Sequence, residues 1–383
     1  MEVIKTLPEI FEEFSEQRRN SFMSAYETKQ KNIPFVGTFC TYTPTEIIMA
    51  AGAIPVGLCS FSDETISDAE QDLPRNLCPL IKSSYGFAKT QKCPFFYFSD
   101  LIIGETTCDG KKKMYEMLGE IKDTYIMELP NRQSIMGRKL WREEVVALKN
   151  KLEEKFDVEI TEEKVREQVK LSNQNRLALR HFYELMKLDP PPMAGANLYG
   201  VLYGSSFKFD RQKAIDEVNA LTERIKKEYD EGNRPIPKRP RILVTGCPIG
   251  GNAMKVVKSI EANGGNVVCF ENCGGAKSVD ELVNEYADDI YQAIADRYLN
   301  IGCSCMTPDD NRFKLLGRLL DEYKIDAVVE VILQACHTYN VESYNIKRFV
   351  TSKGLPYMCV ETDYSSADIG QLNTRCAAFI EML

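Results

Sequence analysis

Sulfur is the unusual feature of this 383-residue sequence, which contains 13 cysteines but only two histidines and one tryptophan. An odd number of thiols cannot pair completely, and disulfides are rare in the reducing cytosol. The cysteines are therefore small core residues, catalytic thiols or metal ligands. No Cys-x-x-Cys occurs in the sequence, which argues against zinc ribbons, thioredoxin-type redox pairs and the compact ferredoxin motif. A metal site would have to be assembled from cysteines far apart in the chain.

Eight cysteines lie where thiolate chemistry is favoured. In an open parallel sheet, ligands bind beyond the carboxyl ends of the strands, and the positive end of a helix dipole favours a thiolate. Most of the eight lie at expected strand ends or before an expected helix, and two form a Cys-Ser-Cys sequence. The set is Cys40, Cys78, Cys108, Cys247, Cys273, Cys303, Cys305 and Cys336. Eight thiols exceed what one tetrahedral zinc ion can use, although thiolates suit zinc as well as iron.

The remaining cysteines are interpreted as structural. Three lie within apolar runs expected to be strands and one lies in an expected helix, which predicts core packing for Cys59, Cys269, Cys359 and Cys376. Cys93 precedes Pro94 at the expected start of a strand, which also favours a structural role. Cys247 keeps an alternative to metal binding, because Gly-Cys-Pro-Ile-Gly-Gly is also typical of a tight strand-to-helix turn.

Two stretches have the alternation of strands and helices that is typical of α/β domains. Expected strands lie at 33–40, 54–59 and 95–108 in the first stretch and at 241–247, 266–273, 327–336 and 355–363 in the second. In the first stretch, Thr43 is expected to cap a helix that begins at Pro44. We therefore predict an α/β fold with two doubly wound, Rossmann-like domains, mainly parallel sheets and a helical insertion.

The helical insertion lies between the two stretches. Apolar residues recur there with helical spacing, namely Trp141, Val145, Leu148, Leu152 and Phe156. Residues 232–240 are rich in proline and basic residues and are interpreted as a linker. The predicted organisation is an N-terminal α/β domain at 1–137, the insertion and linker at 138–239, and a C-terminal α/β domain at 240–383.

Composition excludes other classes of protein. A net charge of −8 does not favour nucleic-acid binding, and no apolar run approaches the roughly 20 residues that span a bilayer. The first 20 residues lack the apolar stretch of a secretory signal. We expect a cytoplasmic protein with no nucleic-acid or membrane partner.

Eight sequence blocks resemble those of the 2-hydroxyacyl-CoA dehydratase and benzoyl-CoA reductase component superfamily, and they occur in the family's order. The blocks cover nearly the whole chain and are CTYTPTEIIMAAGAIPV (40–56), NLCPLIKSSYG (76–86), GETTCDGKKKMYE (104–116), VTGCPIGG (244–251), ENCGGAK (271–277), GCSC (302–305), ILQACH (332–337) and QLNTRCAAFIEML (371–383). More narrowly, a single chain this rich in thiols resembles the double-cubane cluster proteins. The resemblance implies an oxygen-sensitive iron–sulfur protein that forms a homodimer and holds its cluster between the two α/β domains.

The resemblance also implies which cysteines bind the cluster. By motif, Cys78, Cys108 and Cys336 correspond to the family's ligands of one [4Fe-4S] cubane. A second cubane, which would make a double-cubane [8Fe-9S] cluster, needs three further ligands from Cys40, Cys247, Cys273, Cys303 and Cys305. The choice among those five stays open, with Cys247 the one that we associate with the double-cubane branch.

The implied activity is low-potential electron transfer: a separate ATP-hydrolysing [4Fe-4S] activator reduces the cluster, which reduces a small-molecule substrate. One alternative is a 2-hydroxyacyl-CoA dehydratase subunit with a single [4Fe-4S] cluster and a heterodimeric partner. Another is a thiol-rich binding module that holds zinc or no metal.

Three further features have two interpretations each. His337 and Glu46 are candidate proton donors to the reaction, although a turn histidine and a carboxylate at a helix start are equally ordinary structural roles. Lys111, Lys112 and Lys113 could dock an activator or a CoA phosphate, but a solvated helix face explains them more simply. The second histidine, His181, is expected to be structural.

Overall fold

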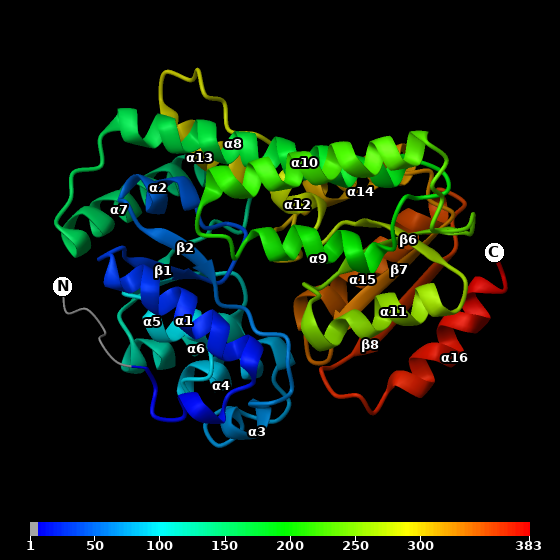
Figure 1. Cartoon of the computed structure of the whole chain (residues 1–383), viewed down its shortest axis with the longest axis horizontal. Helices are drawn as coiled ribbons and strands as arrows, with labels where there is room; N and C mark the ends of the chain where they lie inside the picture. Colours follow the sequence, from blue (N-terminus) through cyan, green and yellow to red (C-terminus); the bar gives the residue numbers. More distant parts are fainter. Residues whose placement is uncertain (1–6) are drawn as a thin grey trace. The chain divides into compact units, whose positions relative to one another are not determined.

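The computed structural model describes residues 7–383 and contains two compact units (Figure 1). Within the described residues, the first unit comprises 7–60, 64–170 and 283–299, and the second comprises 61–63, 171–282 and 300–383. The residues expected to form a separate helical insertion are therefore divided, with 138–170 in the first unit and 171–239 in the second. Among residues 7–383, no helix is both long and apolar enough to cross a membrane.

The first unit contains a four-stranded parallel sheet with the order β2-β1-β3-β4. Its strands are β1 (Phe35–Thr38), β2 (Ile54–Gly57), β3 (Leu101–Glu105) and β4 (Thr124–Met127). Its helices are η1 (Phe11–Glu13), α1 (Glu16–Gln30), α2 (Thr45–Ala50), α3 (Ile66–Ala69), α4 (Pro79–Lys89), α5 (Pro94–Phe98), α6 (Asp109–Ile121), α7 (Ile135–Phe156) and α13 (Ile290–Leu299). Helix α8 (Glu162–Glu184) contributes residues to both units.

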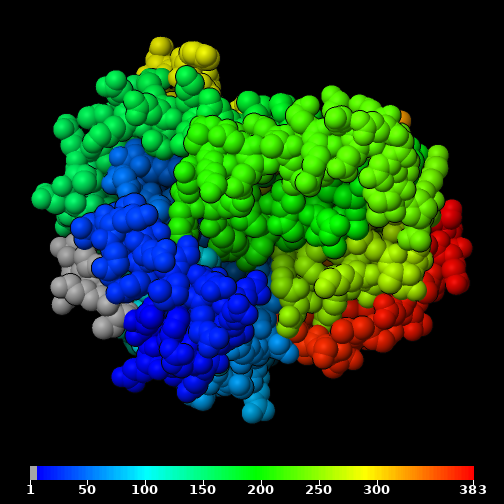
Figure 2. Space-filling model, viewed as in Figure 1, coloured from blue at the N-terminus to red at the C-terminus, as the bar shows by residue number. Residues whose placement is uncertain are grey.

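The second unit contains a four-stranded parallel sheet with the order β6-β5-β7-β8. Its strands are β5 (Arg241–Gly246), β6 (Asn266–Phe270), β7 (Ala327–Leu333) and β8 (Tyr357–Thr362). Its helices are η2 (Leu185–Lys187), α9 (Gly195–Ser205), α10 (Arg211–Asp230), η3 (Gly251–Met254), α11 (Lys255–Ala262), α12 (Ala276–Val279), α14 (Asp310–Glu322), α15 (His337–Ser352) and α16 (Ile369–Ile380). Helix α16 packs against α11, and Figure 2 shows these red and yellow-green segments in continuous contact.

The two sheets have the same topology. In each unit the first strand lies in the interior, its chain successor lies at one edge, and the third strand lies on the first strand's other side. The order therefore reverses beside the first strand, which creates the switch point of a doubly wound fold. The predicted α/β class with two parallel sheets is confirmed.

Continuous apolar sequence explains why the central strands form where they do. Every residue of β3 and β7 is buried, as expected for parallel strands covered on both faces. The expected strand at 95–108 was too long, because its first residues form helix α5 instead. Pro94 occupies the first turn, and the Cys93 Sγ accepts a hydrogen bond from the Phe96 amide at 3.4 Å. Cys93 thus has a structural role as a helix cap.

The predicted helical periodicity in the insertion is confirmed for α7. Four of the five residues expected on its apolar face are fully buried, namely Trp141, Val145, Leu148 and Leu152. Phe156, the fifth, is half-buried at the end of the helix.

Candidate cluster-binding site

Two predicted ligands occupy equivalent places in the two units. Cys108 follows the end of β3 and is the N-cap residue of α6, and Cys336 follows the end of β7 and is the N-cap residue of α15. Each strand is the third of its own sheet. A thiol at a helix N-terminus is favoured as the thiolate that metals bind.

The other strand ends carry cysteines in both units as well. Cys40 follows β1 as Cys247 follows β5, and Cys59 follows β2 as Cys273 follows β6. Cys59 therefore lies beyond its strand and not within it, so the prediction of an in-strand position is wrong. Its thiol is half-buried and donates to the Phe39 carbonyl at 3.0 Å.

The connection between the second and third strands also carries thiols in each unit. Cys78 is the N-cap residue of α4 in the first unit, and Cys303 and Cys305 lie in the loop before α14 in the second. Each unit thus presents thiols from the same three strand ends and from the same connection.

The turn that holds Cys336 is strained. Ala335 has a φ of +57°, a left-handed conformation that residues with a Cβ adopt at a cost. The Cys336 amide donates to the Leu333 carbonyl at 3.0 Å, and the His337 amide donates to the Ala335 carbonyl at 3.1 Å. Strain of this kind is typical of functional sites. His337 begins α15 and is exposed.

Cys247 occupies a turn that requires glycine. Gly246 has a φ of +104°, and a Cβ there would lie 2.2 Å from the Val331 carbonyl oxygen. The Cys247 amide donates to that carbonyl at 2.8 Å, while the Cys247 Sγ accepts from the Leu333 amide at 3.3 Å. The buried thiol therefore joins the ends of β5 and β7, as the tight-turn interpretation expects, and its role as a ligand stays a prediction.

The cysteines expected in the core have environments that favour the neutral thiol over the thiolate. Burial raises the pKa of Cys269 to about 12 and that of Cys376 to about 11, and both side chains are fully buried. Burial also raises the pKa of Cys359. A neutral thiol is a packing group and a weak hydrogen-bond partner. The Cys269 Sγ, for example, accepts from the Tyr183 hydroxyl at 3.1 Å.

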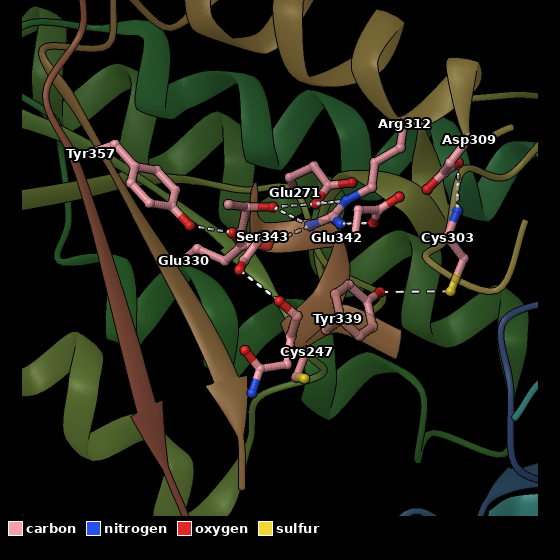
Figure 3. Close-up of polar contacts among 12 residues, drawn as sticks. Cys247, Glu271, Cys303, Asp309, Arg312, Glu330, Tyr339, Glu342, Ser343 and Tyr357 are labelled. Atoms are coloured by element: carbon pink, nitrogen blue, oxygen red, sulfur yellow. Dashed lines mark hydrogen bonds and ion pairs between the residues drawn. The ribbon is translucent and has the colours of Figure 1, made fainter. Parts of the chain in front are cut away.

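Cys303 lies in a polar cluster that favours its thiolate (Figure 3). Its sulfur lies 3.7 Å from the Tyr339 hydroxyl, and its amide donates to Asp309 Oδ1 at 3.1 Å. Hydrogen bonds from Cys305 and the charge of Lys277 hold the pKa of Cys303 well below its usual range, although burial opposes them. Burial and the nearby Glu342 raise the pKa of Asp309 to about 9.

Behind this thiol lies a buried network of charges centred on Arg312. The guanidinium contacts Glu271 at 3.5 Å and Glu330 at 3.2 Å, and it also pairs with Glu342. Lys277 pairs with Glu271 at 3.0 Å. Sequence reasoning missed this network, because its members are single charged residues whose proximity depends on the fold.

The first unit has its own half-buried lysine near several thiols. Lys111 Nζ donates to the Phe39 carbonyl at 3.1 Å. Burial alone would lower the pKa of Lys111. Nearby groups that can carry negative charge outweigh burial and raise the pKa well above its usual range, namely Tyr115, Cys59, Cys40 and Cys108. The neighbouring lysines behave as predicted for a solvated face, since Lys112 and Lys113 are exposed and pair with Asp109 and Glu116.

Two buried carboxyl groups lie near the same strand ends. Burial raises the pKa of Glu105 to about 7, against a hydrogen bond from Thr43 that lowers it. Thr43 therefore does not cap α2 as expected, and Pro44 is the N-cap residue. Glu46, the predicted proton relay, is fully buried and accepts from the Tyr298 hydroxyl at 2.7 Å.

The donor set suits an iron–sulfur cluster in its chemistry. Thiols at strand ends and helix N-termini, with Lys111 near one set and Lys277 near the other, match the preference of iron–sulfur clusters for thiolates. Among residues 7–383, no three side chains of His, Cys, Asp or Glu are grouped closely enough to hold a single metal ion.

A family model described as 2-hydroxyglutaryl-CoA dehydratase, D-component, matches residues 40–383. The chain belongs to this family. It is 55% identical over its whole length to the full length of a putative dehydratase subunit, YjiM, from Escherichia coli (strain K12). It is 23% identical to the (R)-phenyllactyl-CoA dehydratase beta subunit of Clostridium sporogenes, with 97% of both chains covered.

Family membership confirms the superfamily that the sequence blocks indicated. A subunit of benzoyl-CoA reductase from Thauera aromatica is 20% identical, with 89% of both chains covered. The relatives are thus dehydratase and reductase subunits, and the family-model match includes all eight candidate cysteine ligands.

Proposed function

We propose that this chain is a cytoplasmic iron–sulfur reductase that carries a double-cubane [8Fe-9S] cluster and forms a homodimer. It would receive low-potential electrons from an ATP-hydrolysing [4Fe-4S] activator and reduce a small molecule. The observation that carries the proposal is the repetition of thiols at equivalent strand ends of two sheets with the same topology. One cubane would use only three or four of these thiols, whereas two cubanes with three ligands each would use six of the eight candidates.

The proposed ligands of one cubane are Cys78, Cys108 and Cys336, each the N-cap residue of a helix. The second cubane would take three of Cys40, Cys247, Cys273, Cys303 and Cys305. When bound, such a cluster supplies electrons at low potential, and the hydrogen bonds and burial around its sulfurs set that potential. Glu46 and His337 are the proposed sources of the protons that accompany the electrons.

A second candidate is a dehydratase subunit with a single [4Fe-4S] cluster and a different partner subunit. It is supported by the relatives named as beta subunits of acyl-CoA dehydratases. In this case the second set of thiols would stabilise the fold and its turns, as Cys247 does between β5 and β7.

Metal analysis separates these candidates. The protein is to be purified under strict exclusion of oxygen, and iron and acid-labile sulfide are to be counted per chain beside the mass in solution. About eight iron per chain in a homodimer supports the double cubane, and about four favours the single cluster. A colourless protein without iron would contradict both and leave a thiol-rich module with zinc or no metal.

A further inference from the structure

The sulfur of Cys303 lies beside a buried hydroxyl group. The Tyr339 hydroxyl oxygen lies 3.7 Å from it, as the dashed line in Figure 3 marks. A cysteine sulfur that binds iron has given up its hydrogen, so it can accept hydrogen bonds but cannot donate them.

The other neighbour of the tyrosine hydroxyl group leaves the hydroxyl hydrogen for the sulfur. Lys277 Nζ lies 3.4 Å from the Tyr339 hydroxyl oxygen. An ammonium has hydrogens but no lone pair, so the hydroxyl oxygen must accept from Lys277. The hydroxyl hydrogen is then available to donate to the sulfur of Cys303.

Two buried cations fix the position of the tyrosine ring. The Arg312 guanidinium lies 4.9 Å from the ring centroid and the Lys277 ammonium lies 5.7 Å from it, a cation–π arrangement. Glu271 pairs with both cations and holds them in place. Tyr339 itself is 5% exposed, so water does not compete strongly for its hydroxyl group.

We propose that Tyr339 is a positioning residue that raises the cluster's reduction potential by donating a hydrogen bond to the sulfur of Cys303, one of the candidate ligands. The proposal rests on the proposed iron–sulfur function and deepens it. Hydrogen bonds to a ligand sulfur stabilise the added negative charge of the reduced cluster. The pair of Lys277 and Tyr339 thereby tunes the cluster without contacting substrate.

The premise that Cys303 binds the cluster is tested by counting iron in anaerobically purified variants. Cys303→Ala should lose a large part of the iron that the wild type holds, while Cys376→Ala, at a fully buried thiol of α16, should keep it. If the wild type holds no iron, the proposed function itself fails. If the wild type holds iron and Cys303→Ala keeps all of it, only the present inference is overturned.

The tuning role is tested with Tyr339→Phe, which removes one hydroxyl group and keeps the ring. Its iron content should equal that of the wild type, and its midpoint potential, followed by EPR during a redox titration, should be more negative. We expect about a tenfold lower ratio of reduced to oxidised cluster at a fixed potential, which corresponds to about 59 mV for one electron.

Tyr183→Phe is the matched control, because its buried hydroxyl group donates to the sulfur of Cys269, a cysteine placed in the core of the same unit. It should leave the potential unchanged. An unchanged potential in Tyr339→Phe, or an equal shift in both variants, overturns the tuning role. If Tyr339→Phe does not fold, resonance Raman spectra of the wild type in D2O replace it, and the absence of a deuterium shift in the Fe–S(Cys) bands then overturns the proposal.

Discussion

Single buried side chains decide much of the chemistry that this protein can perform. The candidate thiols are distinguished less by their own exposure than by their neighbours: Cys303 accepts hydrogen bonds beside Lys277, whereas burial raises the pKa of Cys269 to about 12. The same contrast separates Lys111, whose ammonium reaches the Phe39 carbonyl, from the exposed lysines beside it. Predictions at this scale concern buried charges whose partners are known.

Glu105 should make the protein less stable as the pH rises through its native pKa. The ordinary pKa of a glutamate is 4.5, and burial raises the pKa of Glu105 to about 7. Between pH 4.5 and pH 7 the carboxyl group therefore keeps its proton in the native state but has lost it in the unfolded state. Stability should fall from about pH 4.5 to about pH 7 and then level off, with a total loss of about 3 kcal/mol. Glu105→Gln should lack this decline. Urea unfolding midpoints measured across the range test the prediction, and Glu116→Gln, at an exposed site of α6, is the control that should retain the wild-type profile.

Arg312→Met should strongly destabilise the second unit at neutral pH. Three carboxylates surround the fully buried guanidinium, namely Glu271, Glu330 and Glu342. Removal of one partner from a buried ion pair typically costs about 3–5 kcal/mol, because it leaves charges buried without compensation. Lowering the pH should recover part of the loss relative to the wild type, as these carboxyl groups take up protons. Thermal unfolding at pH 7 and pH 5.5 measures both effects, and a variant within about 1 kcal/mol of wild type at pH 7 would contradict the prediction.

At the scale of the element, the candidate site is built from the loops that follow the strands. Continuous apolar runs, glycines and prolines are local signals, so the sequence alone predicted the parallel strands, the helix α7 and the position of most thiols after a strand. The aromatic residues of 95–98 misled the prediction, because a strand and a short buried helix have similar composition there. Thr43 likewise looked like a helix cap, but its hydroxyl group donates to Glu105, a partner 62 positions away in the chain. No local sequence pattern indicated that Glu105, Lys277 and Arg312 would be buried with charged or polar partners.

Gly246→Ala should destabilise the protein by more than the cost of a left-handed backbone conformation, because it also creates a steric clash. The substitution forces a left-handed φ of +104° on alanine and places its Cβ 2.2 Å from the Val331 carbonyl oxygen. Gly354 is a matched control, since its φ is +76° and no atom lies within 4 Å of a Cβ there. Gly354→Ala should cost about 1 kcal/mol from the backbone conformation alone, and Gly246→Ala should cost clearly more.

Unfolding midpoints of the two alanine variants provide the comparison. The additional loss in Gly246→Ala should come with weaker protection of the Cys247 and Leu333 amides from hydrogen exchange, since both hydrogen bonds lie at this turn. Equal destabilisation by the two substitutions would mean that the close approach of β5 and β7 is not needed to place Cys247.

At the scale of the whole molecule, two units with the same sheet topology present thiols from equivalent places. The sequence predicted two α/β stretches with thiols at strand ends, but it did not predict the strand order within each sheet. It also did not predict that the segment 283–299 belongs to the first unit although the chain around it belongs to the second. Composition indicated a metal protein, and the resemblance of sequence blocks indicated the family. Only the strand orders reveal that Cys108 and Cys336 occupy the same position in their respective sheets.

Cys108 and Cys336 should act as a pair if they hold the same cubane, as we propose. Cys108→Ala and Cys336→Ala should each lose the iron of that cubane, and the double variant should lose no more than either single one, because a shared site is already lost in each. Cys376→Ala, at a fully buried thiol of α16, is the control that should keep its iron. Iron and sulfide counts on the four anaerobically purified proteins test the pairing. Losses that add in the double variant would show instead that each unit's helix N-terminus serves a separate cluster, and unchanged iron in either single variant would remove that cysteine from the ligand set.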